Sequence, residues 1–179
     1  MVAVVLVVAA KRSSSGPTSG RTPVTRPDQP PDTSPPAEQT WITAERPRVK
    51  FLRPPGWVTT ETGAWGVFKS PDGEAVLAFS MFNQPGQSTY LLGKAANVLG
   101  VGEVDWTSQG RTTVGAQHFP AATGAGNCNF RGAGGYIWYA TVNPGGVDQI
   151  LMIYTVSARG TAAHKSAALS AINSLQLRD

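Results

Sequence analysis

Residues 136–154, YIWYATVNPGGVDQILMIY, carry the clearest structural pattern in the chain. Two runs rich in aromatic and aliphatic residues flank the four residues 143–146, Asn-Pro-Gly-Gly, which favour a tight turn. Two such runs joined by a short turn are typical of an antiparallel β-hairpin. We therefore expect paired strands at 135–142 and 147–156.

More strand-like segments precede this hairpin. Residues 48–52 alternate polar and apolar side chains, which is the period of a half-buried strand. Residues 70–73, Ser-Pro-Asp-Gly, separate two apolar runs and predict a second hairpin, because each position suits a turn. The other expected strands are 65–69, 74–82, 102–108, 112–119 and 121–131, and the other expected turns are 109–110, Pro120 and 132–135.

Two segments have the periodicity of helices. At 87–99, apolar residues recur every three or four positions, with Ser88 as the expected N-cap and Gly100 as the C-terminal glycine. A second helix is expected at 161–175, with one apolar stripe made of Ala168, Ile172 and Leu175. Strands joined by short turns, with only two main helices, predict an α+β domain in which the helices pack against an antiparallel β-sheet.

Composition divides the chain into three parts. Residues 1–10 are an apolar segment, and residues 11–45 hold seven of the fourteen prolines and many serines and threonines. Such a linker is expected to be disordered, because it has too few large apolar side chains to offset the entropy of ordering. Residues 46–179 carry four of the five tryptophans and all tyrosines and phenylalanines, so they form the expected single globular domain.

The N-terminal apolar run indicates export. Residues 2–10 are too few for a membrane helix, which needs about 20, but they suit the hydrophobic region of a signal peptide, with small residues at 8 and 10 for cleavage. A basic region before the run is missing, which leaves two alternatives: a longer signal peptide, or the outer end of a membrane helix. Lys11 stands where a lipoprotein signal would have cysteine. Both alternatives predict a periplasmic, extracellular or membrane-tethered protein, close to a membrane through this segment.

Charge and cysteine content exclude several classes of partner. The net charge is +4, and only Arg46, Arg48, Lys50 and Arg53 lie close together in the sequence. Nucleic-acid-binding domains usually present a denser basic stripe, so we expect no nucleic-acid partner. The single cysteine, Cys128, excludes an internal disulfide and a cysteine-rich zinc site.

Residues 51–57, Phe-Leu-Arg-Pro-Pro-Gly-Trp, form an apolar strand that ends in proline and then tryptophan. This resembles the opening of PsbP-like domains, a superfamily that includes the Mog-type Ran-binding proteins and many uncharacterised bacterial exported proteins and lipoproteins. The likeness continues through the Asp72-Gly73 hairpin, the middle helix, the tyrosine-rich hairpin and the final helix, and covers most of 46–179. It implies an antiparallel sheet with helices against it and a non-catalytic role in binding or assembly. It assigns no functional residue, and it does not choose among partners.

One pair of residues offers candidate catalytic chemistry. Cys128 and His118 are a candidate thiol nucleophile and base, with Asn127 or Asn129 as the orienting group. The simpler interpretation is a buried cysteine on a strand and a histidine at its edge. We favour it, because no helix N-terminus precedes Cys128 to lower its pKa, and we expect no catalytic residue.

The other polar residues give no recognisable site. His164, expected in the first turn of the last helix, and His118 lack an acidic residue at ligand spacing, so no metal is expected. Glu103 and Asp105 are either a carboxylate pair or the solvated side of an edge strand. The glycines of 124–135 lack both the dinucleotide fingerprint and the P-loop ending, so no cofactor is expected.

The aromatic residues of the last hairpin are the candidate binding surface. They are either core residues or, where no helix covers their face of the sheet, a binding platform. Strand periodicity places Tyr136 and Trp138 on one face and Tyr139 on the other. The set comprises Tyr136, Trp138, Tyr139 and Tyr154.

The sequence therefore predicts a non-enzymatic exported domain that binds a protein or a cell-envelope component in an accessory or assembly role. Two alternatives stay open. One is the extracytoplasmic sensor domain of a membrane receptor, and the other is a small hydrolase that uses Cys128 and His118.

Overall fold

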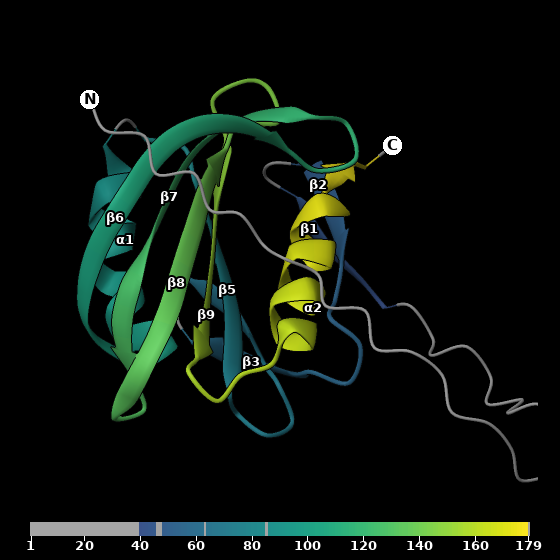
Figure 1. The fold of residues 1–179 in the computed structure, drawn as a ribbon. Coiled ribbons are helices and arrows are strands. Elements are labelled where there is room, and N and C mark those ends of the chain that lie inside the picture. The colour runs from purple at the N-terminus through teal and green to yellow at the C-terminus, as the bar shows by residue number, and fades with distance from the viewer. Residues whose placement is uncertain (1–39, 46–47, 63, 85, 179) are drawn as a thin grey trace, which may run out of the picture. The chain divides into compact units, whose positions relative to one another are not determined.

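The computed structural model describes residues 40–45, 48–62, 64–84 and 86–178. Its main feature is a seven-stranded antiparallel sheet with the order β3-β4-β5-β9-β8-β7-β6 (Figure 1). The strands are β3 (Val58–Thr62), β4 (Trp65–Lys69), β5 (Ala75–Phe82), β6 (Val101–Val114), β7 (Phe119–Phe130), β8 (Ala133–Val142) and β9 (Gln149–Ser157).

Two helices cover opposite faces of this sheet. Helix α1 (Gln87–Leu99) packs on β5, β6 and β9, and helix α2 (Ala162–Asn173) packs on β5 and β9 from the other side (Figure 1). Two separate hydrophobic clusters result, one under each helix, and β5 and β9 alternate their side chains between them. This explains why every residue of β9 after Gln149 is buried. The architecture confirms the α+β class with two main helices.

A second, smaller sheet packs beside α2, and Phe51 of this sheet also contacts Phe68 and Phe79 of the main sheet. It consists of β1 (Trp41–Glu45), β2 (Arg48–Leu52) and β10 (Gln176–Leu177), in the order β1-β2-β10, and β2 packs against α2. Ile42 packs against the hydrophobic cluster under α2.

The strand β1 corrects the predicted domain boundary. The folded part includes Trp41–Glu45, which the sequence assigned to the disordered linker, because pairing with β2 supplies backbone partners that composition does not reveal. Residues 1–39, which include the expected signal segment and most of the expected linker, lie outside the described residues. Within the described ranges, no helix is long and apolar enough to cross a membrane.

The turn between the two longest strands also differs from the prediction. Residues 109–110 do not form a turn, because β6 continues through them and pairs with β7 as far as Val114. The chain reverses instead between Gly115, with φ +81°, and His118, with φ 56°. Left-handed backbone at these two positions makes a tight turn possible, whereas Gly110 keeps an extended strand conformation.

Helix α1 has its predicted bounds but not its predicted N-cap. Gly86, with φ 78°, occupies the N-cap position, and no side chain caps the helix, so the expectation of Ser88 was wrong. Gly100 has φ 69° and donates its N–H to the Asn97 carbonyl, which confirms it as the C-terminal glycine.

Candidate functional site

The four predicted surface aromatics do not form one surface. Tyr136, Trp138 and Tyr154 lie on the face covered by α2, which we call the α2 face, and all three belong to or pack against the cluster under that helix. Tyr139 lies on the opposite face, where its ring meets the exposed Trp106 edge-on at a centroid distance of 5.1 Å. The side-chain alternation of β8 explains this division.

The three aromatics of the α2 face are in contact. Trp138 is opposite Tyr154 in the β8–β9 register, with ring centroids 5.7 Å apart, and Tyr136 lies 6.1 Å from Tyr154. Tyr136 and Trp138 are half-buried, whereas Tyr154 is only 1% exposed and forms the floor beneath them. Among the described residues, the Tyr154 hydroxyl has no hydrogen-bond partner. Burial, together with the neighbouring Tyr136, raises its pKa well above the ordinary value.

An open pocket of about 620 Å³ lies beside Tyr136, where the ends of β7, β8 and β9 meet the first turn of α2. We call it the α2-end pocket. Glycine, alanine and valine make up half of its lining. The other half is Asn127, Cys128, Tyr136 and Ser157 on the sheet side and Thr161 and Lys165 on the helix side. The Lys165 ammonium lies 4.8 Å from the centre of the Tyr136 ring, a cation–π distance.

The start of α2 is fixed by close packing and by hydrogen bonds. A Cβ at Gly160 would overlap the Val156 side chain, so glycine lets the chain approach β9 there. At the helix N-terminus, the Thr161 N–H donates to His164 Nδ1 at 3.0 Å. His164 Nε2 lies 3.1 Å from Asp72 Oδ2, which ties α2 to the β4–β5 turn. The ring of His164 is therefore a bridge between two structural elements.

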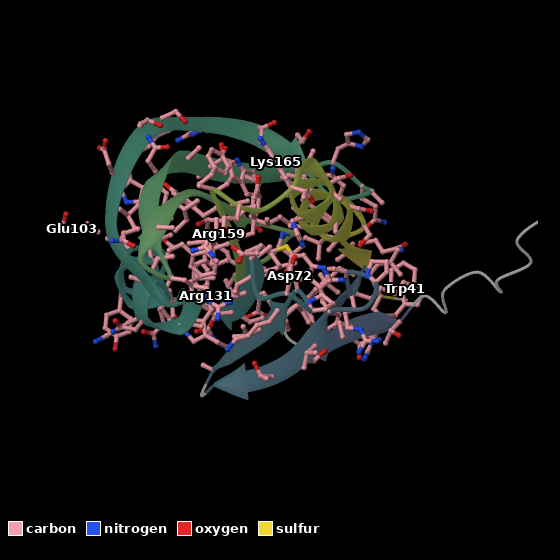
Figure 2. All side chains as sticks on the ribbon, turned by 60° about the horizontal axis from the view of Figure 1, so that its bottom comes forward. Trp41, Asp72, Glu103, Arg131, Arg159 and Lys165 are labelled. Carbon is pink, nitrogen blue, oxygen red and sulfur yellow. The ribbon has the colours of Figure 1, made fainter. Side chains whose placement is uncertain are left out.

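Polar residues gather around this bridge, outside the α2-end pocket. Figure 2 labels Asp72, Arg131 and Arg159, which line a smaller hollow together with Glu74. Arg131 donates to the Gly73 carbonyl at 2.8 Å, and the Ser157 hydroxyl donates to the Glu74 carboxylate. Two acids and two arginines thus lie together at this end of the domain.

Asp72 is held in its ionised form. Its carboxylate accepts the Glu74 N–H at 3.0 Å and the Ser70 hydroxyl at 2.7 Å. These bonds, the backbone one first, lower the pKa of Asp72 below the ordinary value, and His164 contributes less. The Ser-Pro-Asp-Gly turn is therefore closed by the aspartate that the sequence placed there.

The candidate nucleophile and base are not brought together. Cys128 is near one end of β7 and His118 directly precedes the other end, so about ten residues of extended strand, roughly 30 Å, separate them. The Cys128 thiol is 7% exposed and lies 3.4 Å from the Thr155 hydroxyl. Burial raises the pKa of the thiol, and the Thr155 contact opposes this only partly. His118 is an exposed turn residue.

The remaining predicted positions are structural or solvated. Glu103 and Asp105 are exposed on β6 at the free edge of the sheet (Figure 2 labels Glu103). Gly124 and Gly126 are inside β7, where a Cβ would overlap Tyr139 or the β6 backbone. The element that follows β7 is the strand β8 and not a helix. Among the described residues, no three potential ligands cluster closely enough to hold a metal ion.

Comparison with known proteins identifies the fold. No family model matches the chain, and no curated protein matches its sequence. The solution structure of PsbP (CyanoP) from Synechocystis sp. PCC 6803 matches with a TM-score of 0.58 and 10% identity, over 81% of this chain and 95% of that one. The domain has a PsbP-like fold. This confirms the expectation drawn from 51–57 and the order of elements.

One further structure supports this fold, and another has a weaker likeness. LpqN of Mycobacterium tuberculosis, described as involved in cell envelope biogenesis, has a TM-score of 0.52 and 13% identity, over 79% of this chain and 91% of that one. A protein from Bacteroides thetaiotaomicron matches at a TM-score of 0.46 and 15% identity, and there this chain spans 45% of the other protein's length. At such identities, the likeness concerns the fold alone.

Sequence reasoning missed the α2-end pocket. The pocket requires that the ends of three strands and one helix meet, a tertiary arrangement that no local pattern encodes. A signal was available in Gly134 and Gly135, which the sequence analysis assigns to a turn at 132–135. Gly134 and Gly135 lie inside β8, at the pocket wall.

Proposed function

We propose that this chain is an accessory protein without enzymatic activity, which acts outside the cytoplasm and binds a protein or a cell-envelope component. The observation that carries the proposal is the α2 face, where half-buried Tyr136 lines an open pocket and half-buried Trp138 packs beside it on Tyr154. Aromatic rings that are half-buried beside a concave surface offer a large contact area at low entropic cost.

The choice of a binding role over catalysis is supported by the position of the reactive residues. A thiol catalyst requires a base within hydrogen-bonding reach, and His118 and Cys128 occupy opposite ends of β7. The raised pKa of Cys128 also reduces its thiolate fraction at neutral pH.

The location and the type of partner are supported by two independent features. The apolar run at 2–10 has the length of a signal-peptide core. LpqN, which shares the fold, is described as involved in cell envelope biogenesis. Together, these two features favour an extracytoplasmic partner.

The proposal is tested by affinity capture from a solubilised envelope fraction of the source cells. The tagged full chain is compared with Tyr136→Ala and with the control Tyr90→Ala, because Tyr90 is 63% exposed on α1. We expect a defined component that the parent chain and Tyr90→Ala retain equally and that Tyr136→Ala retains at least fivefold less. Equal retention by all three proteins, or retention by none, would contradict the proposal.

A further inference from the structure

The α2-end pocket has the size and the wall chemistry of a small-molecule site. Its volume of about 620 Å³ lies within the range of roughly 300–1,000 Å³ found for ligand pockets. Gly134, Gly135, Val156 and Ala158 form apolar walls, and Tyr136 also lines the pocket. A ligand that fills this pocket therefore has an apolar body.

The charge near the pocket is positive. Lys165 is the charged residue among the described residues that line it, and none of those residues is acidic. Asp72 and Glu74 lie in the neighbouring hollow, where Arg131 and Arg159 balance them, and Asp105, opposite Asn127 in the β6–β7 register, is exposed on the edge strand. The N-terminal end of α2, which also lines the pocket, adds a partial positive charge. Within the pocket lining itself, Lys165 thus carries the charge, and it favours an anionic group.

Resting on the function proposed above, we infer that the α2-end pocket binds a small amphipathic anion. The apolar body lies along Tyr136 and the glycine wall, and the single anionic group pairs with the Lys165 ammonium. The ammonium is already held above the Tyr136 ring, at 4.8 Å from its centre. Aromatic ring and cation are therefore placed to contact the two halves of one ligand.

Two substitutions separate the two halves of this site. Lys165→Met removes the charge and keeps most of the side-chain length. Gly134→Leu adds a side chain in the pocket wall, where a Cβ meets no atom within 4 Å and the backbone φ is not left-handed, so neither overlap of the Cβ nor backbone strain opposes it. Each has a matched control on α1: Lys94, whose ammonium lies 5.6 Å from the Tyr90 ring centre, and Gly93, where a Cβ also meets no atom.

The test is a fluorescence titration of the full chain with two probes of one aromatic skeleton. 8-Anilinonaphthalene-1-sulfonate carries an anionic group, and N-phenyl-1-naphthylamine lacks it. We expect Lys165→Met to weaken binding of the sulfonate about fivefold, the magnitude of a solvent-accessible ion pair, and to leave the neutral probe within about twofold. We expect Gly134→Leu to weaken the binding of both probes about tenfold or more. The control variants Lys94→Met and Gly93→Leu should bind both probes as the parent chain does.

Three results would overturn the inference. They are no binding of the sulfonate by the parent chain, unchanged sulfonate binding in Lys165→Met, and unchanged binding of both probes in Gly134→Leu. Because Lys165 is exposed, its variant tests the charge even where Gly134→Leu does not fold. Failure here is distinguishable from failure of the proposed function, since capture of a partner through Tyr136 is measured without either probe.

Discussion

At the scale of single residues, the reactivity of the Cys128 thiol distinguishes a structural role for this cysteine from a catalytic one. Its thiol is buried under Thr155, and burial raises its pKa. We predict slow alkylation of the native full chain, with a rate that rises only above the ordinary thiol pKa, and fast alkylation after unfolding. Iodoacetamide kinetics at several pH values measure this directly. Fast modification with a midpoint well below pH 8 would support the hydrolase alternative instead.

Asp72 predicts how the domain responds to acid. Because its pKa is lower in the folded state than its ordinary value of 3.8, its carboxylate contributes stability that is fully present above that value. The contribution is lost as the pH falls through the folded pKa, so the window lies below pH 3.8. We expect Asp72→Asn to lower the denaturant midpoint of unfolding at pH 7. Well below pH 3.8, the midpoints of the variant and the parent chain should become equal.

The control for this prediction is Asp105→Asn, at an exposed carboxylate on β6. Denaturant unfolding at a series of pH values should show no such convergence for that variant. If Asp72→Asn and the parent chain differ by the same amount at every pH, the hydrogen bonds to the Asp72 carboxylate do not stabilise the turn.

At the scale of elements, the buried side chain of Trp57 anchors the connection between β2 and β3 to the core. It follows β2, is 5% exposed, and belongs to the cluster under α2. Replacing a buried tryptophan by alanine costs about 3–5 kcal/mol, so Trp57→Ala should lower the free energy of unfolding by that amount. Urea unfolding checks this, with the exposed Trp106→Ala as the control. An unchanged midpoint for Trp57→Ala would mean that its contacts do not hold the loop.

Elements defined by local chemistry were predictable from the sequence, and elements defined by distant pairing were not. The 70–73 turn and the 136–154 hairpin follow from residue types alone. By contrast, β10 is only Gln176–Leu177, and it is a strand because β2 lies beside it. The prediction of a turn at 109–110 was wrong for a related reason. A Gln-Gly pair permits a turn, but pairing with β7 keeps β6 extended through it.

The same distinction applies to the candidate site. Periodicity placed Tyr136 and Trp138 on one face, since alternation is a property of any strand. It did not show that Tyr154 lies beneath them, nor that Lys165 from the last helix reaches Tyr136, because these contacts join residues 16 to 29 positions apart in the sequence.

At the scale of the whole molecule, the revised boundary predicts which part of the N-terminal region stabilises the domain. Deleting residues 1–39 should leave the melting temperature within about 2 °C, since residues 11–39 offer little apolar surface for burial and residues 2–10 are the expected signal segment. Deleting residues 1–45 removes β1 and the Ile42 contact with the core, and should lower it by about 5 °C or more. Differential scanning calorimetry measures both. Equal melting temperatures for the two truncations would mean that β1 adds no stability.

The central claim is that the α2 face is where this domain meets its partner. Its most direct test is site-specific photocrosslinking in the source cells, with a benzophenone amino acid in place of Tyr136 or, as the control, of Tyr90 on α1. The account predicts a discrete adduct from position 136 and none from position 90. Adducts from position 90 alone, or equal labelling from both positions, would contradict it.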